Sequence, residues 1–388
     1  MAAERISDFR RWLQRAAADR TLETPNGTGI ISDSVPDVYD ANYLSVEAPT
    51  VNAGDLAADA DAVLEASHHC RVIVEDGAPG VADDFARLGF DRSTHLVLAH
   101  TGKPDRRVDT SVVRDVTLDD LTPARTETTL GEPWGDANLA AQLNEAKRLV
   151  AAAVPTRFFA AIVDGAVAGW CELRRRGGVA QIEDVEVLQA LRGRGLGRAV
   201  VQHALDAGQQ AGDLVFLEAL ADDWPRELYA KLGFTIVGPR DVYTRLPGPL
   251  TRLRLRTPRL ELRVATRAEA RRLFAVAEAG IHEDVDDFVA HVTGSTLDSV
   301  RFVAFLEGAP VGVQAVDVHP EWVTTGSWLG ATYQGDGLDA EMRAAVLTYA
   351  FDVRHARVAR SEDSEVELRG DRFRSPVPVT VDGVRPLA

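Results

Sequence analysis

The chain has 388 residues, a length that suggests two or three domains. Its composition, 45% hydrophobic and 26% charged, is typical of soluble globular proteins. Its formal net charge of −16 argues against nucleic acid and anionic membranes as partners, because an acidic surface repels both. With two cysteines, no apolar leader and no apolar stretch long enough to span a bilayer, we expect a cytoplasmic protein that has no metal site and no membrane contact.

Residues 1–105 alternate between strand and helix patterns but carry no glycine-rich loop. A polar segment with glycine and proline at 100–105 ends this first expected domain. The expected elements, in chain order, are a strand at 43–46, a helix at 57–66, a strand at 71–74, a helix that ends at Leu88-Gly-Phe90 and a strand at 95–98.

A second expected domain, residues 106–248, extends to a linker rich in proline and glycine. It contains a hairpin followed by a strand, a helix and a strand, a pattern that predicts a mixed α/β sheet with helices on its faces. Pro225 suits the first turn of the last helix. The expected strands are 157–163, 168–174, 181–188, 214–219 and one from 234, and the expected helices are 196–208 and 225–232.

A glycine-rich loop, residues 192–197, lies between the strand that ends near Leu188 and the next helix. Its glycines allow a ligand to approach the backbone, and the free N–H groups at the helix start point toward one anion. Nearby arginines add positive charge, so the loop predicts a pyrophosphate site. It lacks the Gly-x-Gly-x-x-Gly of dinucleotide folds and the Gly-Lys-Ser/Thr of a Walker loop. An ordinary α/β turn is the alternative.

The loop and the segment Leu228-Tyr-Ala-Lys-Leu-Gly-Phe234 together resemble the GNAT superfamily of acetyltransferases. Arg192, Gly195 and Gly197 match the acetyl-CoA loop of that family, and Tyr229 with Gly233-Phe234 matches its Tyr-x-x-x-Gly-Phe element. The resemblance implies acetyl-CoA as co-substrate and direct transfer of the acetyl group to a primary amine of a small molecule or peptide. The cofactor-binding residues that it implies are Val185, Val187, Leu188, Arg192, Gly193, Arg194, Gly195, Leu196, Gly197 and Arg198, with the N–H groups of Val187 and Leu188 receiving the thioester oxygen.

The expected catalytic residues are Glu183 and Tyr229. Residues 182–187 resemble the Leu-Glu-Asp-Phe-x-Val strand of polyamine acetyltransferases, in which the matching glutamate is a base that acts through water. Asp184 and Glu186 should point to the opposite face, since side chains alternate along a strand, and they inherit the role if that assignment is reversed. Tyr229 is protonated at pH 7 and can donate to the CoA sulfur. A solvated strand edge and a core tyrosine are the alternatives.

Trp134 occupies the position of the substrate-binding helices and loop in GNAT folds, so we expect it to line an acceptor pocket or to be a buried anchor.

Two short echoes indicate related modules in tandem, with chance as the alternative. Residues 192–197 recur in altered form 142 residues further on, as Gln334-Gly-Asp-Gly-Leu-Asp339. Leu88-Gly-Phe90 recurs as Leu232-Gly-Phe234. We therefore expect tandem GNAT folds, of which residues 1–105 are a degenerate lobe with one glycine and no arginine at 49–54, where a CoA loop would lie.

The third expected domain, residues 249–388, resembles the ribosomal-protein-alanine N-acetyltransferases in residues 253–263 and 325–338. It carries Asp339 where the family has a small residue, and it lacks the segment that should follow the next strand, so we expect a truncated second GNAT-like domain that binds CoA poorly. A silent acyl-CoA sensor or scaffold is the alternative to an active enzyme. The acceptor's identity and the oligomeric state, a homodimer included, stay open.

Overall fold

The computed structural model describes residues 2–47, 52–248, 250–251, 253–277, 284–361 and 364–383. They divide into two compact units, one formed by Met1–Leu64 with His69–Arg245 and the other by Glu65–His68 with Leu246–Ala388. The expected boundary near residue 248 lies close to this division. No division falls near residue 105, because the first two expected domains share one sheet.

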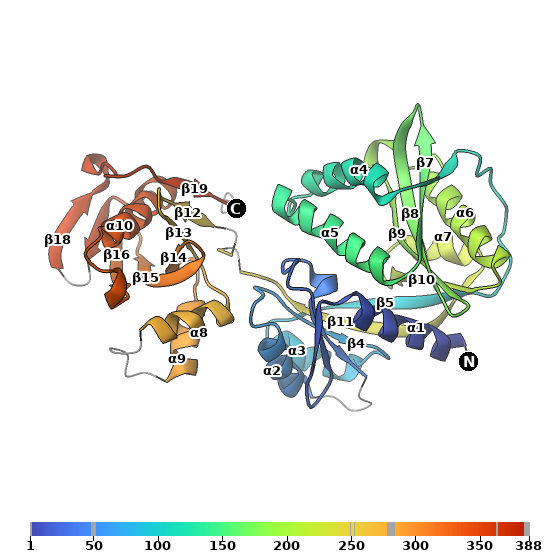
Figure 1. Cartoon of the computed structure of the whole chain (residues 1–388), viewed down its shortest axis with the longest axis horizontal. Coiled ribbons are helices and arrows are strands. Elements are labelled where there is room, and N and C mark those ends of the chain that lie inside the picture. Colours follow the sequence, from blue (N-terminus) through green and yellow to red (C-terminus); the bar gives the residue numbers. More distant parts are fainter. Residues whose placement is uncertain are drawn as a thin grey trace. The chain divides into compact units, whose positions relative to one another are not determined.

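That sheet has eleven strands in the order β1-β2-β3-β4-β11-β5-β10-β9-β8-β7-β6, which confirms the expected mixed α/β class (Figure 1). Residues 48–51, which contain part of the segment where a first CoA loop would lie, are outside the described residues. The strands are β1 Arg20–Glu23, β2 Thr28–Ile31, β3 Tyr43–Val46, β4 Cys70–Val74, β5 Asp91–His100, β6 Val113–Val116, β7 Thr156–Val163, β8 Ala166–Arg176, β9 Val179–Val187, β10 Leu214–Leu220 and β11 Phe234–Arg245.

The two halves of this sheet exchange their last strands. Strand β5, from the first half, lies antiparallel between β11 and β10, and β11 lies antiparallel between β4 and β5. Both exchanged strands follow a Leu-Gly-Phe turn, in which Gly89 and Gly233 have φ values of 79° and 90°. At Gly233 a Cβ would come within 2.9 Å of the Gly102 carbonyl carbon, so the turn and the linker fit only with glycine.

Helices cover both faces of the sheet. Phe9 of α1 packs on Phe216, whereas Ala199 and Val200 of α6 belong to the core cluster that contains Leu217, the next residue along the strand. Alternation along the strands therefore separates a face under α1, α4 and α5 from a face under α2, α3, α6 and α7. The helices are α1 Ala2–Ala17, α2 Ala53–Val63, α3 Ala82–Arg87, α4 Leu118–Gly131, α5 Ala137–Ala153, α6 Leu196–Gln210 and α7 Pro225–Lys231.

The second unit has its own eight-stranded sheet, in the order β18-β17-β16-β15-β14-β13-β12-β19. Strand β17 pairs directly with β18, and no helix equivalent to α7 lies between them among the described residues. Its elements are β12 Arg254–Arg256, β13 Leu260–Arg263, α8 Arg267–Val276, α9 Val285–Thr293, β14 Ser299–Leu306, β15 Ala309–Val318, β16 Trp322–Leu329, α10 Leu338–Thr348, β17 Val358–Ser361, β18 Ser364–Arg369 and β19 Thr380–Asp382.

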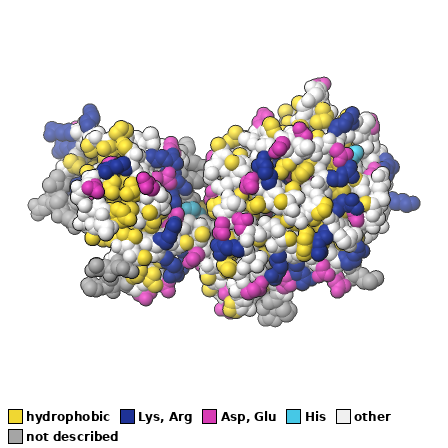
Figure 2. Space-filling model, viewed as in Figure 1, with side chains coloured by type: hydrophobic (Ala, Val, Ile, Leu, Met, Phe, Trp, Pro, Cys, Tyr) yellow, Lys and Arg dark blue, Asp and Glu magenta, His cyan; other side chains and the backbone are white. Residues whose placement is uncertain are grey.

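Figure 2 shows acidic and basic side chains interspersed over the visible face of each unit, without a broad field of one sign. None of the helices in the described part of the chain is long and apolar enough to cross a membrane.

Candidate functional site

The glycine-rich loop leads from β9 into α6. Gly193 and Gly195 have φ values of 78° and 81°, a conformation that glycine adopts without strain. No heavy atom of the described residues lies within 4 Å of the position that a Cβ would take at either glycine. No side chain caps the start of α6, so the first N–H groups of the helix remain available to an anion. The loop therefore fits a pyrophosphate.

The three arginines of this segment point in different directions. Arg192 is 60% exposed and bonds to Glu186 Oε1 at 2.9 Å and to the Val187 carbonyl at 3.1 Å. Arg194 is exposed, and its described side chain has no ion-pair partner. Arg198 is buried and binds Asp105 and the Arg106 carbonyl, so its guanidinium belongs to the linker and not to the loop. The expected charge of Arg198 at the phosphate site is therefore wrong for the side chain.

Next to this loop, β9 separates from β10. Their pairing ends at Ile182 and Leu217, although both strands continue. The Leu188 N–H donates to the Ala168 carbonyl at 3.0 Å, which uses it in the pairing with β8. The Val187 N–H points away from β8 and donates at 3.2 Å to the side chain of Glu186, its own neighbour. Of the two N–H groups expected to receive the thioester oxygen, Val187 alone has the suitable direction.

A β-bulge in β9 changes the expected alternation of the acidic residues. Glu172 pairs with Glu183 and Trp170 with Glu186, so β9 has one extra residue in this interval. Asp184 lies in this bulge and has a φ of 57°. As a result Glu183 and Asp184 line the same cavity, and the prediction that they face opposite sides is wrong.

Glu183 and Asp184 have different environments within that cavity. Burial raises the pKa of Glu183, although Arg174 and Lys147 oppose the shift. Burial would also raise the pKa of Asp184, but Lys147 and Arg125 outweigh it and lower that pKa to about 2. Asp184 also accepts a hydrogen bond from Trp170 Nε1 at 3.1 Å. Asp184 is thus held as a paired carboxylate, and Glu183, with its raised pKa, is the better proton acceptor of the two.

Tyr229 of α7 lines the same cavity and is 6% exposed. Burial first, and then the nearby Glu183 carboxylate, raise its pKa, so the phenol stays protonated at neutral pH. Its hydroxyl has no hydrogen-bond partner among the described residues. The structure therefore brings the expected base and the expected acid to one cavity.

The cavity has a volume of about 480 Å³ and is lined by both halves of the first unit. Trp134 is not part of it: this side chain is 47% exposed on the turn between α4 and α5. The expectation that Trp134 lines the acceptor pocket or is a buried anchor is therefore wrong. It lies in the turn at 132–135, which follows the end of α4 at Gly131.

Comparison with known proteins identifies the fold. The sequence model of the acetyltransferase (GNAT) family matches residues 118–234, which contain α4 to α7, the glycine-rich loop and both expected catalytic residues. Residues 118–234 therefore form a GNAT-family domain.

Solved structures with weak overall similarity include a conserved protein of unknown function from Staphylococcus epidermidis, with 15% identity, a TM-score of 0.47 and coverage of 58% of this chain and 93% of that one. A GCN5-related N-acetyltransferase from Kribbella flavida has 17% identity, a TM-score of 0.45 and coverage of 64% and 97%. A GNAT-family acetyltransferase from Colwellia psychrerythraea has 15% identity, a TM-score of 0.34 and coverage of 45% and 64%.

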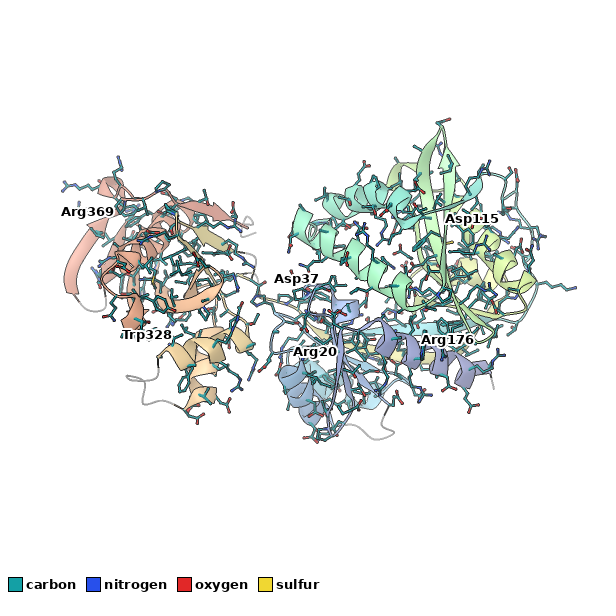
Figure 3. All side chains as sticks on the ribbon, in the orientation of Figure 1. Arg20, Asp37, Asp115, Arg176, Trp328 and Arg369 are labelled. Atoms are coloured by element: carbon teal, nitrogen blue, oxygen red, sulfur yellow. The ribbon has the colours of Figure 1, made fainter. Side chains whose placement is uncertain are left out.

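The N-terminal half adds a wall to the GNAT cavity that sequence reasoning missed. Tyr43, Arg71 and His95 line the cavity from β3, β4 and β5. A loop of the same half is fixed to α5: the Asp37 N–H donates to Gln142 Oε1 at 2.9 Å, and Gln142 Nε2 donates back to Asp37 Oδ2 at 2.8 Å (Figure 3). These contacts join the N-terminal half to the helix that carries Lys147, a residue of the cavity lining.

Charged residues from α1 and α5 also went unpredicted. Lys147 is one of only three lysines in a chain that otherwise uses arginine, and that rarity was the one available signal. Its Nζ lies 2.9 Å from Glu172 and 3.2 Å from Asp184. Arg10 contributes from α1, where it pairs with Glu75 and Glu218.

The second unit has a similar glycine-rich loop, but a side chain of the unit binds to it. Gly335 and Gly337 have φ values of 95° and 77°, close to those of the first loop. Here, however, Arg259 donates to the Asp336 carbonyl at 3.0 Å and pairs with Glu341 at 2.5 Å. A side chain of the unit itself is therefore bonded to the loop.

Proposed function

We propose that the first unit transfers an acetyl group from acetyl-CoA directly to a primary amine. The observation that carries this proposal is the position of Glu183 and Tyr229 on one cavity, at the point where β9 leaves β10. The family match to residues 118–234 supports acyl transfer in general. The choice of an amine acceptor and of acetyl-CoA goes beyond that match.

The loop at 192–197 would hold the pyrophosphate of acetyl-CoA, because it presents N–H groups and open space above two glycines. Acetyl-CoA supplies the activated acyl group. The Glu186 side chain would move away and leave the Val187 N–H to the thioester oxygen, where negative charge develops during attack. A donor already fixed in direction stabilises that charge without reorganisation.

Glu183 takes the proton that the acceptor ammonium must lose before its nitrogen can attack. The nitrogen lone pair then forms the new bond to the acyl carbon, and the carbon–sulfur bond breaks with its electrons on sulfur. Tyr229 donates its phenolic proton to that sulfur, and the second proton that the nitrogen loses as the amide forms returns to the Tyr229 oxygen. Each proton transfer of this kind contributes about 10²–10⁴-fold to the rate.

The test measures free CoA released from acetyl-CoA over a panel of amines. Wild type should release CoA with at least one amine, and Glu183→Gln and Tyr229→Phe should lose most of that rate. Glu227→Gln is the matched control, since Glu227 is an exposed glutamate on α7. Tight binding of acetyl-CoA without release by any amine would overturn the proposal and favour a silent acyl-CoA sensor.

A further inference from the structure

The wall of the cavity carries two clusters of charged side chains in which the cations and anions pair with one another. Arg10 contacts both Glu75 and Glu218, and Arg240 contacts the same two carboxylates. All four side chains are at least 86% buried. Each cation and each anion in this group has two partners, so none of them is available to a ligand without breaking a buried network.

The second closed cluster lies under α5. Lys147 pairs with Glu172 and Asp184, Arg174 pairs with Glu172, and Arg125 pairs with Asp184. Glu183 lies beside this cluster but has no ion-pair partner among the described residues. It receives one side-chain hydrogen bond, from Gln181 at 3.3 Å. Among the carboxylates in and beside this cluster, Glu183 is therefore the one open to a cationic group.

Arg71 is the corresponding cation. Its side chain is 14% exposed, it lines the cavity from β4, and its buried Nε has no hydrogen-bond partner. Its one ion-pair partner in the described structure is Asp40, at 2.8 Å, and that side chain is 83% exposed. Asp40 itself lines the cavity, and Arg71 lowers its pKa, so an incoming anion would compete with this single carboxylate for the guanidinium. Tyr43 and His95 flank it with groups that are neutral at neutral pH, since burial raises the pKa of Tyr43 and lowers that of His95.

We propose that the acceptor is an elongated zwitterion, such as a short peptide, whose amine lies at Glu183 and whose carboxylate binds Arg71. This inference rests on the proposed function and makes Arg71 the residue that determines specificity. Strand β4 is four strands away from β9, a distance of about 19 Å between strand axes. Side chains stand roughly perpendicular to a sheet, so the positions of Glu183 and Arg71 favour an acceptor whose two charges are several bonds apart over a free α-amino acid. A polyamine would place a second cation against Arg71.

The experiment uses the whole chain and calorimetry in the presence of CoA, with triglycine and triglycinamide as probes. Both have the same amine, and only triglycine has the carboxylate. Triglycine should bind at least tenfold more tightly, because a charge-assisted pair with a buried guanidinium is a strong contact. Arg71→Gln should remove this preference, and the exposed, matched Arg87→Gln should keep it.

Asp40→Asn provides a second variant at an exposed position, where folding is not at risk. It removes the carboxylate that competes for Arg71, so triglycine should bind several-fold more tightly while triglycinamide is unchanged. Equal affinity for the two probes, or binding of neither, would overturn the inference. Preferential binding of triglycine without acetylation of any amine would instead defeat the proposed function alone. Acetylation of amines with and without a carboxylate at the same KM would leave that function standing and defeat the inference.

Discussion

Tyr243 of β11 stacks on Phe85 of α3, with ring centroids 4.1 Å apart and an interplanar angle of 16°. The Tyr243 hydroxyl donates to the Ala78 carbonyl at 2.7 Å. The two rings come from what the sequence divides into separate domains, so the last strand of the GNAT half completes the core of the N-terminal half. Leu98 of β5 does the reverse and packs in the core under α6.

This exchange predicts that residues 106–248 do not fold alone. Without residues 1–105, strands β10 and β11 lose the partner between them, and their edges and Phe216, which packs on Phe9 of α1, are exposed. The isolated fragment should aggregate, or should show an unfolded circular dichroism spectrum. Co-expression with residues 1–105 should restore a soluble complex. A cooperative thermal transition in the isolated fragment, together with CoA binding, would contradict the prediction.

Gly195→Asp should abolish binding of CoA to the first loop, because it places a carboxylate at the helix start and a side chain at a φ of 81°. Gly212→Asp is the matched control: this glycine has a φ of 73° beyond the other end of α6, and its Cβ would also meet open space. Both variants should lose a similar amount of stability in thermal denaturation. Titration calorimetry should show loss of CoA binding for Gly195→Asp alone. An equal loss of CoA affinity in both variants would refute a role for the loop.

Glu183→Gln should lower kcat/KM by about 10²–10⁴-fold at neutral pH. In the wild type, the rate should rise with pH as Glu183 deprotonates, at a pH above the usual glutamate range because burial raises its pKa. In the variant that step disappears, and the remaining rate should follow the deprotonation of the amine itself at higher pH. A pH–rate profile that is the same in both proteins would remove Glu183 from the mechanism.

Tyr229→Phe should lower kcat by about 10²–10⁴-fold with little change in KM for acetyl-CoA. The hydroxyl has no hydrogen-bond partner in the described structure, so its removal should leave the melting temperature nearly unchanged. Steady-state kinetics and thermal denaturation of the same preparation test both statements. Wild-type turnover would mean that Tyr229 serves the core and not the reaction.

One CoA should bind per chain. In the second unit Arg259 is bonded to the loop at Asp336 and to Glu341, and Asp339 adds a negative charge in the first turn of α10. A pyrophosphate would have to displace the first contact and approach the second charge. Calorimetric titration with acetyl-CoA should give a stoichiometry near one that falls to zero in Gly195→Asp. A stoichiometry near two, with one site surviving that substitution, would establish a second working loop.

Local patterns predicted the local features of this fold. Residues 43–46 form a strand with the expected bounds, and the Gly-rich and Leu-Gly-Phe segments have matching φ values in their repeats. The exchange of β5 and β11 could not be predicted in this way, because pairing between strands more than a hundred residues apart leaves no periodic signal. The bulge at Asp184 was missed for a similar reason: its positive φ occurs without a glycine.

The wall formed by Arg71 and His95 was missed because it belongs to a half of the sheet whose own loop carries no cofactor signal. Helix α1 and its Arg10 were not assigned either, although Arg10 lines the cavity. These residues belong to the site because both halves share one sheet. Local sequence patterns do not predict which distant strands pair in a sheet.

The position of β5 also sets the order in which the chain can fold during its synthesis. Leu214, the first residue of β10, lies 114 positions after His100, the last residue of β5. At roughly 5–20 residues per second, about 6–23 s pass on the ribosome before either neighbour of β5 is made. Throughout that interval both edges of β5 are unpaired, although Val97 and Ala99 can already pack on Ile6 and Phe9 of α1. A chain released early from synthesis would therefore expose two open strand edges, which favour aggregation.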